Sequence, residues 1–171
     1  MKTDGSLRPQ PWRAAAAIFF AGVVIGCYVP ANPFATTVSA DDITTVSFTT
    51  TAAHNLRIVG LLVAGGLMLA IPTVLVAAWN GLQVGGLFVG LEPSALRLSL
   101  LVHGVPESLG QIAGTTAGLG LAVQTVRRLS LDQPFSIRPI VWWTLTAIVL
   151  TVTAAILEST VTPVVAKEAF L

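Results

Sequence analysis

The stretch IVGLLVAGGLMLAIPTVLVAAWNGLQVGGLFVGL, residues 58–91, decides the fold class. Its 34 residues carry no charge, and they lie between Arg57 and Glu92. A helix that crosses a bilayer needs about 20 consecutive apolar residues, so this stretch is long enough for one crossing and the start of another. It therefore predicts a membrane protein built from helices.

Three further uncharged stretches lie outside this one. Residues 14–40, 108–126 and 139–157 contain 27, 19 and 19 residues without a charged side chain. Each of them is close to or above the length of one crossing. The chain is therefore expected to be an all-α, polytopic transmembrane bundle, with residues 1–171 forming one membrane domain.

The composition excludes several other classes of protein. The 171 residues include 9 Lys and Arg and 8 Asp and Glu, whereas 54% are hydrophobic and the mean hydropathy is +0.82. Soluble domains usually carry about a quarter of their residues as charges, so disorder and a cytosolic enzyme are poor interpretations. A net charge of +1 gives no attraction to nucleic acid. The single cysteine, Cys27, excludes both a disulfide framework and a Cys-based metal site.

Charge placement predicts about five crossings and their orientation. The predicted spans are residues 14–30, 58–79, 80–107, 108–126 and 140–157. Basic residues collect in short cytoplasmic loops, so the basic tail 1–13 and the basic loop 127–138 are both expected inside. An odd number of crossings then puts the Thr-rich connector 31–57 and the C-terminus outside the plasma membrane.

Two of these spans have a second interpretation. The third is a poor straight helix, because Pro93 lacks a backbone donor and Glu92 is charged, so a helix broken near Glu92-Pro93 is expected. The first follows a basic tail, as in a signal peptide, and residues 24–27, which end at Cys27, are similar to a lipobox. We expect a retained helix.

The polar side chains near the membrane are candidates for function. In His103-Gly104-Val105-Pro106-Glu107 a turn is expected, with Pro106 opening the next helix and Glu107 capping it. The competing hypothesis is a proton relay or ligand site, since ionisable groups at membrane depth tend to be functional. Asn80 is expected at the turn between the second and third spans. Glu158 is expected to be hydrated or paired with Arg97 or Arg57.

Glycines four residues apart predict close helix packing. Such pairs occur at Gly22 and Gly26 and at Gly81 and Gly85, and a longer stripe contains Gly110, Gly114 and Gly118. A spacing of four places the residues on one helix face, where a neighbouring helix can approach closely. Packing within the chain and a contact between subunits both remain open, and the longer stripe is the first candidate for the subunit contact.

No catalytic motif is found in the sequence. It contains no nucleophile elbow, no His-Glu-x-x-His and no phosphate-binding loop. His54 is the only His besides His103, and no spacing of ligands supports a metal site. We therefore expect neither enzymatic activity nor a cofactor.

The order of several short motifs resembles the stage II sporulation protein M (SpoIIM) family. The motifs are Asn55-Leu56, Asn80-Gly81 with Gly85, His103-Gly104-x-x-Glu107, Ala113-Gly114, Ala117-Gly118-Leu119, and AAILE at 154–158 with Thr162-Pro163. The resemblance runs from the first span to Pro163. It implies an all-helical membrane protein without catalytic activity, and it marks seven candidate functional residues: Asn55, Asn80, Gly81, His103, Gly104, Glu107 and Glu158.

Two functional hypotheses follow from this resemblance. Family members in spore formers look like scaffolds that gather cell-wall enzymes, so the first hypothesis is a subunit that organises a membrane protein complex. Other relatives look like membrane subunits of ABC-type exporters, so the alternative is a permease-like subunit working with a separate ATPase. The expected partners are the lipid bilayer, other membrane proteins and further copies of the chain, but no nucleic acid.

Overall fold

The computed structural model describes residues 10–29, 36–37, 47–92 and 96–168. These residues form six α-helices, one 3-10 helix and two very short strands. The helices are α1 (Pro11–Tyr28), α2 (Phe48–Ala64), the 3-10 helix η2 (Gly65–Met68), α3 (Ile71–Gly90), α4 (Leu96–Leu131), α5 (Arg138–Thr160) and α6 (Thr162–Glu168). The strands β1 (Thr36–Thr37) and β2 (Leu91–Glu92) pair in parallel. The predicted all-α fold class is confirmed.

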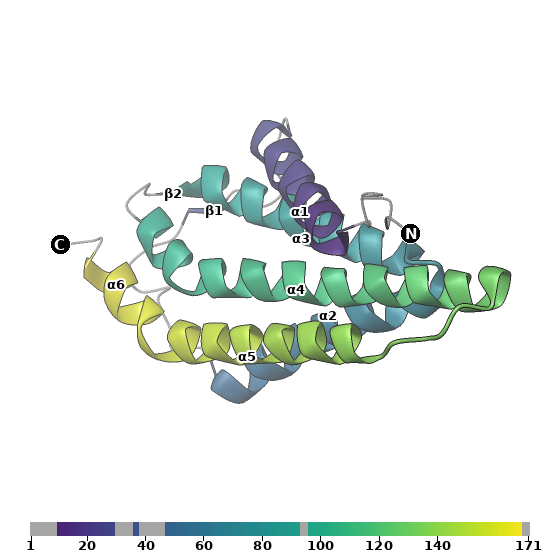
Figure 1. The fold of residues 1–171 in the computed structure, drawn as a ribbon. Helices are drawn as coiled ribbons and strands as arrows, with labels where there is room; N and C mark the ends of the chain where they lie inside the picture. The colour runs from purple at the N-terminus through teal and green to yellow at the C-terminus, as the bar shows by residue number, and fades with distance from the viewer. Residues whose placement is uncertain (1–9, 30–35, 38–46, 93–95, 169–171) are drawn as a thin grey trace, which may run out of the picture.

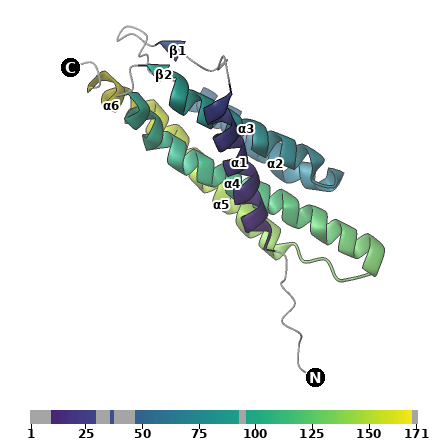
Figure 2. The same cartoon turned by 90° about the horizontal axis from the view of Figure 1, so that it is seen from above.

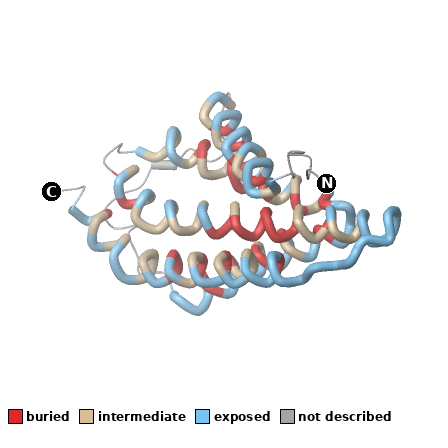
Figure 3. The backbone as a smooth tube through the Cα atoms, in the orientation of Figure 1, coloured by how far each residue is buried: buried red, intermediate tan, exposed pale blue. Residues whose placement is uncertain are grey.

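The five long helices run alternately up and down the bundle (Figures 1 and 2). The start of α1, the α2–α3 turn and the α4–α5 loop lie at one end. The ends of α1, α3 and α5 and the starts of α2 and α4 lie at the other, together with α6. Figure 3 shows that the longest run of buried residues lies in the middle of α4, which the other helices surround.

Four helices are long and apolar enough to cross a membrane: Pro11–Tyr28, Phe48–Met68, Ile71–Gly90 and Arg138–Thr160. Helix α4 has 36 residues but is less apolar, because its buried positions are filled largely by Gly, Ala and Thr. A helix enclosed by other helices needs small residues more than it needs apolar side chains for lipid. The sequence therefore understates how deeply α4 is buried.

A tight turn divides the predicted second span, residues 58–79. Leu69 and Ala70 have φ of 55° and 64°, in the left-handed region that L-residues rarely adopt, and α3 begins directly after them. The buried Thr73 hydroxyl donates to the Leu62 carbonyl oxygen at 2.8 Å and so fastens the start of α3 to the end of α2. The prediction of one straight crossing here is wrong, because the turn is closed by packing within apolar sequence that carries no charge.

The boundaries of the predicted third and fourth spans, 80–107 and 108–126, shift as a result. Asn80 lies inside α3 rather than at a turn, and residues 96–126 belong to one helix, α4. Because α3 and α4 run in opposite directions, 80–107 is not one crossing (Figure 1). The expected break near Glu92-Pro93 falls between α3 and α4, and Pro93 lies outside the described residues.

The predicted loops are shorter than expected where the structure describes them. Helix α2 already begins at Phe48, inside the predicted connector 31–57, most of which is outside the described residues. Helix α4 extends to Leu131, so the basic loop of 127–138 reduces to residues 132–137. The side-chain amide of Gln124 exchanges two hydrogen bonds with the backbone of Ser136 and holds this loop against α4.

Candidate functional site

A polar cavity of about 420 Å³ lies between α2, α3, α4 and the end of α5. Six of the seven candidate functional residues line it: Asn55, Asn80, His103, Gly104, Glu107 and Glu158. These residues are up to 103 positions apart in the sequence, from Asn55 to Glu158, yet four helices bring them to one place. Gly81, the seventh, lies on the opposite side of α3 and packs against α1.

Helix α4 carries three polar side chains of the cavity on successive turns. His103, Glu107 and Gln111 are four residues apart, which is the spacing of one helix face. Helix α4 runs without interruption through Gly104 and Pro106, so the expected turn at this point is wrong. Glu107 is roughly three turns from the helix start and caps no helix. Proline in a helix interior costs about 3 kcal/mol, which the packing of neighbouring helices offsets here.

The hydrogen bonds of the cavity fix its side chains. His103 Nδ1 lies 3.0 Å from the hydroxyl oxygen of Thr162, at the start of α6. The Gln111 side-chain amide donates to Glu107 Oε1 at 3.2 Å, and that of Asn80 donates to the Val76 carbonyl oxygen at 2.7 Å. The cavity therefore has a defined polar wall on α4 and α3.

Gln111 is a site residue that the sequence analysis missed. Its side chain is only 4% exposed, and its Oε1 atom has no hydrogen-bond partner among the described residues. A buried amide oxygen without a partner costs free energy, so such atoms are uncommon in folded proteins. The sequence feature that could have identified Gln111 is its spacing of four residues from Glu107, which places both side chains on one helix face.

Glu158 enters the cavity from α5 and is not paired with an arginine. Within the described part of the chain, Arg97 lies 3.7 Å from Glu92 and donates to the Val89 carbonyl oxygen at 3.2 Å. Arg57 is exposed and lines no part of the cavity. The expected pairing of Glu158 with either arginine is therefore absent, and Glu158 instead shares the cavity with Glu107.

The glycine stripe of α4 is used within the chain. A Cβ added at Gly110 would lie 2.8 Å from Thr151 Oγ1 of α5, and one at Gly114 would lie 3.4 Å from a Leu62 side-chain atom of α2. Gly118 packs against the Leu62 carbonyl oxygen and Thr73. All three glycines are buried, so packing inside the chain takes the place of the expected contact between subunits.

The other glycine pairs bring α1 and α3 into contact. A Cβ at Gly81 would meet the carbonyl oxygen of Phe19, and a Cβ at Gly85 would meet that of Val23. From the other side, Gly22 and Gly26 meet the carbonyl oxygens of Ala78 and Leu82. The two backbones approach so closely that no side chain larger than hydrogen fits at these four positions without movement.

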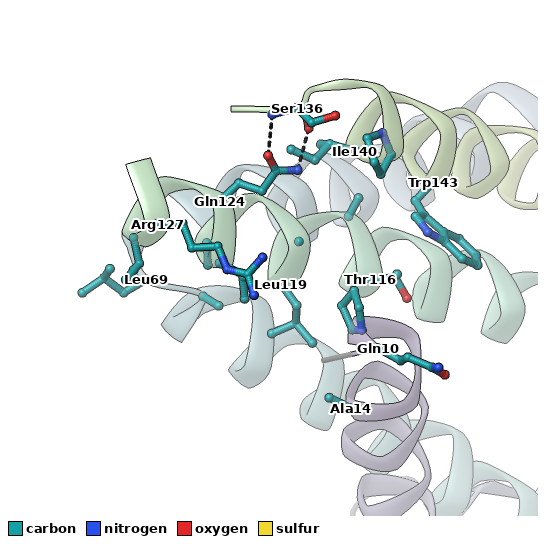
Figure 4. A pocket seen from close by; sticks show the side chains of 18 of the residues that line it. Gln10, Ala14, Leu69, Thr116, Leu119, Gln124, Arg127, Ser136, Ile140 and Trp143 are labelled. Carbon is teal, nitrogen blue, oxygen red and sulfur yellow. Dashed lines mark hydrogen bonds between the residues drawn. The ribbon is translucent and has the colours of Figure 1, made fainter. Parts of the chain in front are cut away.

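A second, larger cavity of about 890 Å³ lies at the opposite end of the bundle, between the start of α1, the end of α4 and the start of α5. Its lining is mostly apolar, and Arg127 is its only charged side chain. Figure 4 shows Arg127 reaching over Leu119, with the paired Gln124 and Ser136 at the rim. None of the candidate functional residues lies there.

The chain is all-helical, four of its helices are long and apolar enough to cross a bilayer, and a cavity with polar side chains lies between the helices. By class it is a polytopic integral membrane protein. The family model of SpoIIM, Stage II sporulation protein M, matches residues 15–163. The chain belongs to this family. No curated protein and no solved structure matches it.

Proposed function

We propose that the chain is a non-enzymatic subunit of the plasma membrane that organises a membrane protein complex. The observation that carries this proposal is the arrangement of the family motif residues. Six of the seven meet at a cavity near the end of the bundle where α6 lies, and no group of three or more metal ligands stands among the described residues. A polar recess of this kind suits the docking of a partner segment better than it suits chemistry.

Five crossings are the topology that this proposal uses. The alternation of α1 to α5 supports α4 as a fifth crossing beside the four apolar helices. Arg13, Arg127, Arg128 and Arg138 all lie at the end where α1 begins, and basic residues favour the cytoplasmic side. The cavity then lies toward the outer leaflet, where proteins that act on the cell wall are accessible.

Photo-crosslinking in cells tests the organising role. A photoreactive residue at Thr50, which is exposed at the rim of the cavity, is expected to give a discrete protein adduct. The same residue at Leu75, which is 65% exposed on α3, is the matched control and should give lipid adducts only. Failure to recover any protein partner from Thr50 or its neighbours on the rim would count against the proposal.

A transport subunit is the second candidate, and the polar cavity inside the membrane domain favours it. Transporters place polar side chains between helices, away from lipid, to line a path. This candidate requires a separate nucleotide-binding subunit. Its test is whether an ATPase co-purifies with the chain and loses its activity when the chain is removed.

Self-association is also part of the proposal. With the glycine stripe of α4 buried inside the chain, a contact between copies would use an exposed apolar surface such as that of α5, which includes Leu145, Val149 and Ile156. Mass measurement of the protein in nanodiscs, with a Leu145→Glu variant as comparison, distinguishes a monomer from an oligomer built on this surface.

A further inference from the structure

The cavity between α2, α3, α4 and α5 contains two carboxyl groups that form no ion pair among the described residues. Glu107 and Glu158 both line it, and its lining includes no Lys and no Arg. Glu107 accepts a hydrogen bond from Gln111. This bond occupies only one of the several lone pairs of the carboxylate. Buried carboxylates are costly unless a cation or several donors accompany them.

Three polar side chains of the cavity wall already have hydrogen-bond partners, whereas one buried acceptor is free. The amide groups of Gln111 and Asn80 donate to Glu107 and to the Val76 carbonyl oxygen, and His103 is engaged with Thr162. Gln111 Oε1, in contrast, lies in a side chain that is 96% buried and has no partner among the described residues. A guest that supplies donors and positive charge would satisfy both the free acceptor and the two carboxylates.

We propose that this cavity binds a protonated amine, with the ammonium group between Glu107, Glu158 and Gln111 Oε1. Three N–H donors of a primary ammonium match three oxygen acceptors from two helices. Ile58, Val84, Leu87 and Leu100 supply an apolar wall for a short hydrocarbon body. The lining includes no Lys or Arg, and His103 is engaged with Thr162, which disfavours a guest that carries a carboxylate or a phosphate.

A bare metal ion fits the site less well than an amine does. No group of three or more His, Cys, Asp or Glu side chains within the described residues is placed to hold a metal ion. The volume of about 420 Å³ is in the range of small-molecule sites and exceeds what one ion fills. This inference rests on the cavity alone, so it can hold whether the chain organises a complex or transports a substrate.

Thermal unfolding of the purified full chain in detergent tests the proposal with n-butylamine at pH 7 as the probe. n-Butanol and butyrate are matched in size and differ in charge, and calcium chloride and sodium chloride test inorganic cations. We expect a saturable rise in Tm of about 5 °C at a hundredfold excess of amine over its Kd, and no saturable rise with the other four. An equal effect of n-butanol, or a saturable effect of an inorganic cation without one of the amine, would overturn the proposal.

Variants locate the site. Glu107→Gln, Glu158→Gln and Gln111→Leu should each weaken n-butylamine binding about 10-fold or more, because each removes an acceptor of the ammonium. Glu168→Gln removes an exposed carboxylate at the same end of the bundle, outside the cavity lining, and should leave the affinity unchanged. Size-exclusion chromatography checks that each variant is folded. If the carboxylate variants do not fold, Gln111→Leu and the wild-type comparison of amine with alcohol still decide the matter, and unchanged affinity in Gln111→Leu overturns the assignment.

Discussion

His103 Nδ1 lies 3.0 Å from the hydroxyl oxygen of Thr162, and this contact fastens α6 to α4 across 59 residues of sequence. Both residues belong to motifs of the SpoIIM family pattern, and both are half-buried. The contact joins the polar cavity to the C-terminal helix.

Removing this hydrogen bond should loosen α6. We expect Thr162→Val to cost about 1 kcal/mol of local stability and to speed amide exchange in Thr162–Glu168 about 5-fold. Thr160→Val is the control, because its hydroxyl bonds only to the Ile156 carbonyl oxygen of its own helix. Hydrogen exchange followed by mass spectrometry makes the comparison, and equal exchange in both variants would show that the contact does not hold α6.

The close packing of α1 on α3 should not tolerate a methyl group. Gly85→Ala places a Cβ against the Val23 carbonyl oxygen and is expected to lower the free energy of unfolding by about 1–3 kcal/mol. Gly60→Ala meets nothing within 4 Å and should raise it by up to about 1 kcal/mol through helix propensity. Denaturant unfolding in detergent measures both values. A Gly85→Ala protein as stable as the wild type would mean that α1 and α3 lie farther apart than in this structure.

The hydroxyl of Thr73 should be needed for the turn between α2 and α3. Thr73→Val keeps the shape of the side chain but leaves the buried Leu62 carbonyl oxygen without this donor, at a cost of about 1–3 kcal/mol. Thr153→Val loses only an exposed bond to Val149 in its own helix and should change stability by less than about 0.5 kcal/mol. Thermal unfolding distinguishes the two, and similar losses would argue against a special role for Thr73.

Glycine at the left-handed turn should stabilise the protein. Leu69 is 64% exposed with φ of 55°, so Leu69→Gly removes backbone strain and loses few contacts, for a net gain of about 0.5–1 kcal/mol. Leu67 is equally exposed but lies inside η2, so Leu67→Gly should cost about 0.5–1 kcal/mol. Opposite signs in a denaturant titration are the expected result. Two losses of the same size would mean that the turn is not formed.

The proposed orientation makes a prediction for labelling in intact cells. In a Cys27→Ser background, a cysteine placed at Glu168 should react with a membrane-impermeant maleimide added outside. One placed at Asp132, in the loop at the opposite end, should react only after permeabilisation. Both residues are exposed, so access across the membrane and not burial decides the result. The reverse pattern would invert the topology.

Much of the architecture could be predicted from the distribution of charged and small residues. The long uncharged stretches gave helices and a membrane setting, and the glycine pairs on α1 and α3 marked the places of close packing. The turn at Leu69 and Ala70 could not be predicted, because it lies within apolar sequence. Its closure depends on Thr73 reaching Leu62, a contact that exists only after α2 and α3 fold back on each other.

The sequence identified most residues of the candidate site, but it did not predict that they meet in one cavity. Gly104 and Pro106 favour a turn by local propensity, yet neighbouring helices keep α4 continuous and put Glu107 inside the bundle. Gln111 is not predicted as a site residue from the sequence, because a lone glutamine usually lies at the protein surface.

The sequence by itself determined that this chain is an all-helical membrane protein, because hydrophobic length and charge spacing act locally along the chain. The tertiary structure alone decided where the helices turn, that the α4 glycines are used within the chain, and that Glu107, Glu158 and Gln111 share one cavity. Those outcomes depend on contacts between helices distant in sequence, whose energies exceed the local preferences of the residues that make them.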